Sequence, residues 1–192
     1  MPTVVVATGN PGKLKEMQVY LDDLGWQLTL KPDEIDIEET GTTFLANARL
    51  KAAGVAQALH QWAIADDSGL AVQALGGAPG IYSARYADSD PARINRLLKE
   101  LEGQRDRSAQ FVCALALANP AGEIVLATEG ICAGEILLEP RGTGGFGYDP
   151  VFYVPALGKS FAEMQPAQKE AVSHRGMAFN QLMPDLKKLA LE

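Results

Sequence analysis

The sequence of 192 residues predicts an α/β fold built around one central sheet. Apolar, β-branched runs alternate with segments of helical periodicity as far as Ala65, which is typical of βαβ units. Two later apolar runs are joined by Asn119-Pro120-Ala121-Gly122, which predicts a β-hairpin. The composition, 47% hydrophobic and 21% charged, is that of an ordinary globular protein. We therefore expect one domain over residues 1–192, in which residues of about 108–138 could form a hairpin lobe.

The first part of the chain should have the order βαβαβ. Gly25 follows the first helical pattern where a helix-ending glycine is expected. Asp66 and Asp67 directly follow the last strand of this set and precede Gly69, so we expect them in the turn that ends the strand. The predicted elements are a strand Thr3–Ala7, a helix from about Lys13 to Leu24, a strand Gln27–Leu30, a helix Thr43–Leu59 and a strand Trp62–Ala65.

The remaining elements are separated by glycine and proline. Pro184 should kink or interrupt the last helix. The predicted elements are an ordered loop Leu75–Arg85, a helix Pro91–Leu101, hairpin strands Ala109–Ala118 and Glu123–Cys132 with a continuation at Gly134–Leu138, a glycine-rich loop Gly142–Gly147, an aromatic stretch Phe146–Tyr153 and a helix from about Ser173 to Leu189.

Charge and hydropathy exclude several classes of function. The net charge of −7 argues against binding to DNA or RNA, which depends on many Lys and Arg contacts to phosphates. The sequence contains no apolar run long enough for a membrane span, and it begins without a basic signal-peptide region. We therefore expect a cytoplasmic protein with no nucleic-acid or membrane partner. Cys113 and Cys132 both lie in apolar runs and should be buried, reduced thiols.

The adjacent carboxylates Asp66 and Asp67 are the most informative feature of the chain. Ionised carboxylates at the end of a buried strand need a cationic partner, because an uncompensated buried charge is costly. Magnesium prefers oxygen ligands and is usually held by one or two carboxylates together with phosphates and water. Glu38 and Glu39 precede the second helix. Acidic residues there either interact favourably with the helix dipole or contribute to such a metal site. The acids are therefore candidates for binding a magnesium-bound polyphosphate.

The segment TGNPGK joins the first strand to the first helix. It resembles a phosphate loop in outline but lacks the spacing of a Walker A motif, so a plain strand-to-helix turn and an anion site both remain open. Lys13 favours the anion site, because a cation in the first helical turn opposes the helix dipole. Lys51 either extends along the surface or reaches phosphates. The candidate loop residues are Thr8, Gly9, Asn10, Pro11, Gly12 and Lys13.

The C-terminal part offers candidates for binding a base. Lys169, His174 and Arg175 cluster near the start of the last helix, as a solvated basic patch or as a binding site. The motif Phe146-Gly147-Tyr148-Asp149-Pro150 either forms a core aromatic cluster at a turn or stacks a base and accepts hydrogen bonds from it. By contrast, His60 is expected to be a surface or helix-capping residue.

Together, the motifs TGNPGK, EETG with FLANARLKA, ADDSGL, LGGAPGIYSARYA, FGYDP and KEAVSHR resemble the inosine/xanthosine triphosphate pyrophosphatase family in order and spacing over nearly the whole chain. The resemblance implies magnesium-dependent hydrolysis of ITP, dITP and XTP to the monophosphate and pyrophosphate. It also implies a homodimer with a long mixed central sheet flanked by helices, and two lobes with the active site in the cleft between them.

The family resemblance also implies residue roles. The phosphate loop maps onto Thr8–Lys13, the metal ligands onto Glu39 and Asp67, and the catalytic acid onto Asp67, with Asp66 beside it. Lys51 and Ser68 match substrate-contacting positions. The base-binding positions map onto Phe146, Gly147, Tyr148, Asp149, Lys169, His174 and Arg175. The chain differs from the usual family residues at Ala46, Gln168 and Glu170. At position 46 the family often has a carboxylate, which this chain lacks.

Other functions remain open at this point. One is a house-cleaning pyrophosphatase for other modified nucleotides, including pyrimidine nucleotides. Another is a non-catalytic nucleotide sensor, although such a protein need not keep Glu39, Asp66 and Asp67. A purely structural module would leave the glycines, acids and lysines at the ends of elements unexplained.

Overall fold

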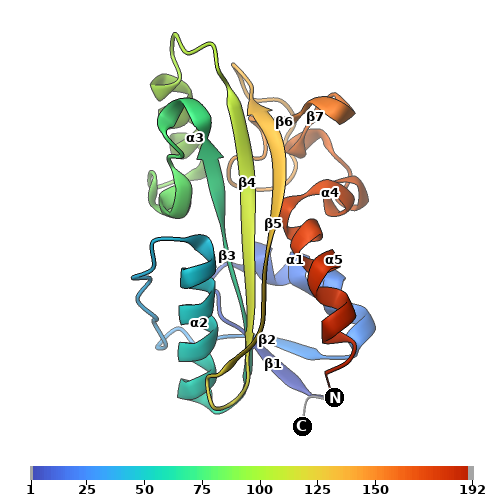
Figure 1. The fold of residues 1–192 in the computed structure, drawn as a ribbon. Helices are drawn as coiled ribbons and strands as arrows, with labels where there is room; N and C mark the ends of the chain where they lie inside the picture. Colours follow the sequence, from blue (N-terminus) through green and yellow to red (C-terminus); the bar gives the residue numbers. More distant parts are fainter. Residues whose placement is uncertain (1, 190–192) are drawn as a thin grey trace. The chain divides into compact units, whose positions relative to one another are not determined.

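The computed structural model describes residues 2–189 and contains a seven-stranded sheet in the order β2-β1-β3-β4-β5-β6-β7 (Figure 1). The strands are β1 Thr3–Val6, β2 Gln27–Leu30, β3 Trp62–Val72, β4 Ser108–Ala118, β5 Ile124–Ile136, β6 Phe152–Val154 and β7 Lys159–Ser160. The helices are α1 Pro11–Leu21, α2 Phe44–Leu59, α3 Asp90–Glu100, α4 Pro166–Val172 and α5 His174–Leu186. Strands β2, β1 and β3 are parallel, whereas β5, β6 and β7 are antiparallel. The predicted mixed sheet with flanking helices is thus confirmed.

The chain divides into two compact units. Unit 1 consists of residues 1–67, 113–130 and 178–192, and unit 2 of residues 68–112 and 131–177. The β4–β5 hairpin contributes to both units, since its turn and adjoining strand segments belong to unit 1 and its outer segments to unit 2.

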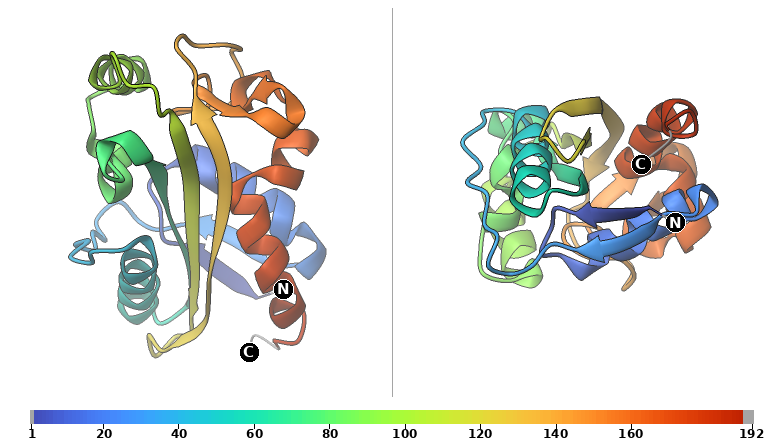
Figure 2. Two further views of the ribbon diagram at one scale, coloured as in Figure 1. Left: turned by 45° about the horizontal axis from the view of Figure 1, so that its top comes forward. Right: turned by 90° about the horizontal axis from the view of Figure 1, so that it is seen from below.

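The strands of unit 1 carry a helical layer on each face (Figure 2). One face packs against α2 almost entirely through alanines, such as Ala52 and Ala56 on the helix and Ala63 and Ala65 on β3, so the helix lies close to the sheet. The other face packs larger side chains of α1 and of the C-terminal part of α5, including Met17 and Phe179, against Ile64 and its neighbours. Because side chains alternate along a strand, odd-numbered residues in the unit 1 part of β3 face α2 and even-numbered ones face α1.

The core of unit 2 joins strand segments, α3 and an aromatic cluster. Leu97 of α3 and Leu70 of β3 are fully buried in this core. Phe111 packs against Phe152 and Phe161, with ring centroids 4.6 and 5.7 Å apart. The aromatic cluster therefore supplies a rigid platform next to the start of α5.

Most predicted elements of the first half are present. Helix α1 begins at Pro11, earlier than expected, because the Asn10 side chain caps it by accepting the Gly12 N–H at 2.8 Å. The helical segment that follows α1 ends at Gly25, which has a φ of +64°. His60 is the left-handed C-cap of α2, which confirms the capping prediction.

Three predictions about element boundaries were wrong or incomplete. Strand β3 does not end before the acids but continues to Val72, since a second apolar run follows them. Helix α5 runs through Pro184 and ends at Leu186. The short elements β6, β7 and α4 were not predicted, because strands of two or three residues and a helix of seven residues are too short to show a clear period. Among residues 2–189, no helix combines the length and the apolar character that crossing a bilayer requires.

Candidate active site

Asp66 and Asp67 lie in the middle of β3, and strand geometry sends their side chains to opposite faces. Pairing of β3 with β1 ends where Val6 lies opposite Ile64, so β1 turns into the Thr8–Lys13 loop just before the acids. The two carboxylates therefore meet different partners, and they do not form one acid pair.

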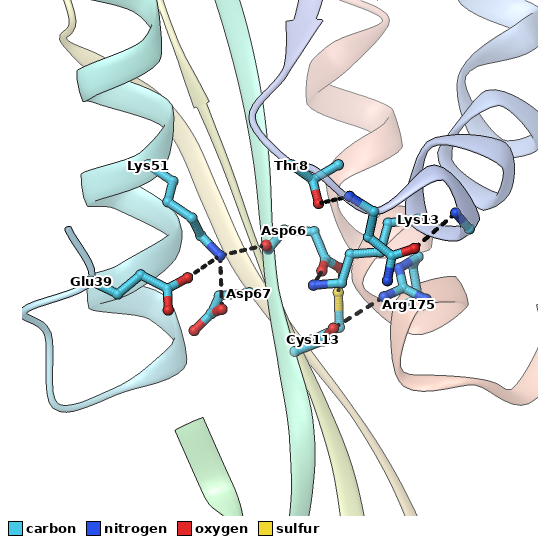
Figure 3. Close-up of polar contacts among 11 residues, drawn as sticks. Thr8, Lys13, Glu39, Lys51, Asp66, Asp67, Cys113 and Arg175 are labelled. Atoms are coloured by element: carbon cyan, nitrogen blue, oxygen red, sulfur yellow. Dashed lines mark hydrogen bonds and ion pairs between the residues drawn. The ribbon is translucent and has the colours of Figure 1, made fainter. Parts of the chain in front are cut away.

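Asp67 faces α2, where Lys51 joins it to Glu39 (Figure 3). The Lys51 ammonium lies 2.8 Å from Asp67 Oδ1 and 2.8 Å from Glu39 Oε1, and it donates to the Asp66 carbonyl oxygen at 3.0 Å. The exposed fractions of the Lys51, Glu39 and Asp67 side chains are 14%, 22% and 11%. The structure thus brings together the predicted metal ligands and Lys51, which does not extend into solvent.

Burial and charge act against each other in this group. Burial raises the pKa of Asp67 above its ordinary value, and the nearby ammonium of Lys51 only partly opposes this. Burial would lower the pKa of Lys51, but the carboxylates of Asp67 and Glu39 outweigh it, so that its pKa is raised. Lys51 therefore stays cationic, whereas Asp67 is a stronger proton acceptor than an exposed aspartate, which suits a general base.

The same group fits a magnesium ion in part. Among the described residues, Asp67 Oδ2 is buried and has no hydrogen-bond partner, so one hard oxygen is available as a ligand. Within residues 2–189 no cluster of three His, Cys, Asp or Glu side chains could hold a metal alone. Magnesium commonly takes one or two carboxylates and completes its shell with substrate phosphates and water. Glu39 and Asp67 therefore match an ion that arrives with a polyphosphate.

Asp66 faces α1 and is fully buried. Its Oδ1 forms an ion pair with Lys13, and its Oδ2 accepts a hydrogen bond from the Cys113 thiol at 2.9 Å. Thr8 Oγ1 accepts the Asn10 N–H at 3.1 Å, which orders the loop before α1. Lys13 is thus anchored at the helix N-terminus, where backbone N–H groups also favour an anion.

The segment that carries Glu39 is held in place by Asn47 of α2. The buried Asn47 side chain accepts the Gly41 N–H through its Oδ1 at 2.8 Å. A Cβ at Gly41 would come within 2.6 Å of the same oxygen. The close approach of Gly41 to α2 therefore determines where Glu39 lies.

Replacing Gly41 by alanine should push this segment away from α2 and cost about 1 to 3 kcal/mol of stability. The displaced Glu39 should also raise the magnesium concentration needed for half-maximal activity. Titrating activity with magnesium measures this effect. Gly25→Ala is the control for the magnesium requirement, since a Cβ there contacts nothing within 4 Å although its φ of +64° adds backbone strain. An equal rise in the magnesium requirement of both variants would contradict the prediction.

In unit 2, Asp149 closes the turn of the FGYDP motif. Its Oδ2 accepts the Phe146 N–H at 3.0 Å and pairs with the Lys169 ammonium at 2.7 Å. The ammonium also lies 4.9 Å from the centre of the Phe146 ring. Asp90 Oδ2 fixes the turn from α3 by accepting the Gly147 N–H at 2.8 Å. Three of the predicted base-binding residues, Phe146, Asp149 and Lys169, therefore form one group.

Gly145 offers a test of this turn. A Cβ at Gly145, which has a φ of +71°, would lie 1.9 Å from Asp149 Oδ2. Gly145→Ala should therefore cost about 2 to 4 kcal/mol and weaken nucleotide binding. Gly76→Ala is matched, since its φ is +62° but nothing lies within 4 Å of the added Cβ. It should cost only about 1 kcal/mol. Unfolding temperatures and KM values of the two variants check the difference.

His174 and Arg175 are buried at the start of α5. The His174 ring stacks on Phe111 with centroids 4.6 Å apart, and Arg175 donates to Ser68 Oγ at 3.1 Å. Tyr148 is also buried, and its hydroxyl donates to the Ser83 carbonyl at 2.9 Å. The Tyr148 hydroxyl therefore supports the fold, and a substrate contact by Tyr148 stays a prediction.

Sequence reasoning missed three supporting residues: Asn47, Asp90 and Cys113. Cys113 could have been identified by its alternation along β4, which places it on the same face as Leu115 and Leu117. Asp90 acts on a turn that is distant in sequence, and Asn47 acts on Gly41, which lies before its own helix, so no helical or strand period marks either residue. The sequence left the separate roles of Asp66 and Asp67 open, and the structure places Asp66 with Lys13 and Cys113 and not with the Glu39 group.

Comparisons with known proteins agree with one another. The Ham1 family model matches residues 4–185. A dITP/XTP pyrophosphatase of Synechocystis sp. is 62% identical over 190 residues, covering 97% of this chain and 98% of the relative. The structure of a Ham1 protein from Coxiella burnetii is 44% identical with a TM-score of 0.90, over 98% of this chain and 100% of that chain. The structure of a nucleoside-triphosphatase, or dITP/XTP pyrophosphatase, from Mycobacterium abscessus is 39% identical with a TM-score of 0.76, over 95% and 99% of the two chains.

Proposed function

Because the chain belongs to the Ham1 family, we propose that it hydrolyses non-canonical purine nucleoside triphosphates to the monophosphate and pyrophosphate. The relative from Synechocystis sp., which is 62% identical, carries the name dITP/XTP pyrophosphatase. Within the structure, the observation that carries the proposal is the half-buried Lys51 ammonium held between Glu39 and Asp67. Removal of these nucleotides from the pool would keep them out of DNA and RNA.

In this proposal, unit 1 binds the triphosphate. The Thr8–Lys13 loop offers the N–H groups of the α1 N-terminus and the Lys13 ammonium to the phosphates. Glu39 and Asp67 would hold magnesium, which supplies charge neutralisation on the phosphate oxygens. Lys51 lies beside both carboxylates and would stabilise the charge on the departing pyrophosphate.

Asp67 is the proposed general base. Its Oδ2 is buried and has no hydrogen-bond partner among the described residues, so it could accept a proton from the attacking water. Asp66 is already engaged by Lys13 and Cys113, so its proposed role is to hold Lys13. In this proposal Asp67 therefore serves proton transfer, and Asp66 serves phosphate binding.

The base would contact the residues of unit 2. Phe146 offers a ring for stacking beside the Lys169 ammonium. His174 and Arg175 are N–H donors suited to the 6-keto oxygen of hypoxanthine or xanthine, whereas adenine presents a 6-amino donor there. Ser68 directly follows Asp67 in the chain and accepts from Arg175.

Homodimer formation and a cytoplasmic location complete the proposal. Light scattering during gel filtration tests the dimer, and fractionation of the cell tests the location.

A substrate panel tests the proposed reaction. Rates on dITP, ITP, XTP, GTP and dTTP, with and without magnesium, should show the first three as preferred and magnesium as required. Ion chromatography should detect pyrophosphate. Release of orthophosphate alone would contradict the proposal, and a preference for dTTP would favour a house-cleaning enzyme for other nucleotides.

A further inference from the structure

Cys113 lies on β4 at a position where its side chain faces Asp66. It is fully buried, and it belongs to the same core face of unit 1 as Ile64 on β3, Met17 on α1 and Leu115 on β4. Its Sγ lies 2.9 Å from Asp66 Oδ2. The thiol is thus a polar group on a face that is otherwise built mainly from aliphatic side chains.

The two oxygens of Asp66 have separate partners. Lys13 pairs with Oδ1, and the Cys113 thiol donates to Oδ2 (Figure 3). A buried carboxylate pays a large desolvation cost, so each hydrogen bond to the ionised form is stronger than its counterpart in water. The two contacts also fix the plane of the carboxylate, because they act on opposite oxygens.

The position of Lys13 depends on this carboxylate. A lysine side chain is long and flexible, and in the first turn of a helix it is repelled by the dipole. The Lys13 side chain is 16% exposed, and its ammonium is paired with Asp66 Oδ1. If Asp66 rotated about its Cα–Cβ or Cβ–Cγ bond, Oδ1 would move and the ammonium would follow it.

We propose that Cys113 is a positioning residue: its thiol holds Asp66 in the orientation that keeps Lys13 ready for a polyphosphate. The activity arm of the test rests on the function proposed above, but the binding arm does not. Cys113 itself touches no substrate in this scheme. Its effect is transmitted through Asp66 to Lys13.

The test compares donors of different kinds at position 113. Cys113→Val removes the donor and adds about one methyl group of volume, whereas Cys113→Ser keeps an O–H donor. We expect Cys113→Val to weaken binding of inorganic tripolyphosphate, measured by calorimetry, about tenfold, which equals about 1.4 kcal/mol. KM for dITP should rise in parallel, with a smaller change in kcat. Cys113→Ser should bind tripolyphosphate within about twofold of wild type, since it keeps a donor to the carboxylate.

A matched control is available at the second buried cysteine. Cys132 lies in unit 2, and its Sγ is 3.8 Å from the carbonyl oxygen of the neighbouring Ala133. Cys132→Val should leave tripolyphosphate binding unchanged. Unfolding temperatures of all variants separate a loss of fold from a loss of positioning.

A double-mutant cycle tests whether the effect of Cys113 on binding passes through Asp66. If Cys113 acts through Asp66, Cys113→Val should have little further effect on binding in the Asp66→Asn background. Wild-type binding by Cys113→Val would overturn the inference, and so would an equal loss in Cys113→Ser. If Asp66→Asn does not fold, the serine and valine variants still decide. A wild-type protein that binds tripolyphosphate but does not cleave dITP would instead refute the proposed function.

Discussion

Replacing Asp67 by asparagine should reduce hydrolysis of dITP by roughly 10³-fold or more, because the variant loses both a proton acceptor and a metal ligand. The fold should survive. Burial raises the pKa of Asp67, so the folded chain binds this proton more tightly than the unfolded chain does. The ionised carboxylate therefore lowers stability as pH rises through the unfolded and then the folded pKa. At a pH above this window, asparagine should leave the unfolding temperature unchanged or higher.

Pyrophosphate release at pH 7 and thermal unfolding over a range of pH measure these two effects. Glu38→Gln is the control, since Glu38 is an exposed carboxylate one residue before Glu39, and it should keep near wild-type rates. Near-normal turnover by Asp67→Asn would remove Asp67 from the mechanism. A clear loss of stability would show that its contact with Lys51 outweighs the cost of burying its charge.

Selectivity against adenine should be large and should depend on the buried donors of unit 2. A site built from buried donors leaves them unsatisfied when the ligand presents another donor, so dITP should be preferred over dATP by roughly 10⁴-fold in kcat/KM. His174→Phe is the most informative variant. Phenylalanine can keep the stacking on Phe111 but has no N–H group.

We expect His174→Phe to lower kcat/KM for dITP by about 100-fold and to leave that for dATP nearly unchanged. The ratio of the two constants, and not either rate alone, is the measurement. Arg175→Lys provides a second test, because lysine keeps the charge but loses the planar guanidinium. Equal losses on both substrates would instead indicate that these residues only support the fold.

Much of the site could be predicted because short motifs place chemistry beside strongly patterned elements. The run Thr3–Val6 followed by turn residues predicts both a buried strand and the loop that carries Lys13. The periodicity of α2 likewise predicts the helix on which Lys51 lies. These elements have local signals, since burial of one helix face or of a whole strand leaves its period in the sequence.

The boundary of β3 shows where local reasoning failed. Two adjacent acids and a glycine normally indicate a turn, but Leu70 and Val72 resume the buried pattern beyond them. Pairing within the sheet outweighs the local preference, because β3 keeps β4 as a hydrogen-bonded neighbour after its pairing with β1 has ended. A longer window would have contained this second apolar run.

The sequence by itself determined the α/β class, the order of the longer elements and which residue types are available for phosphate, metal and base. Only the tertiary structure decided that Asp66 belongs with Lys13 and Cys113, and Asp67 with Lys51 and Glu39. The physical reason is the two-residue period of a strand, which sends neighbouring side chains to opposite faces. What each acid meets there depends on helices that are distant in the sequence and packed by the fold.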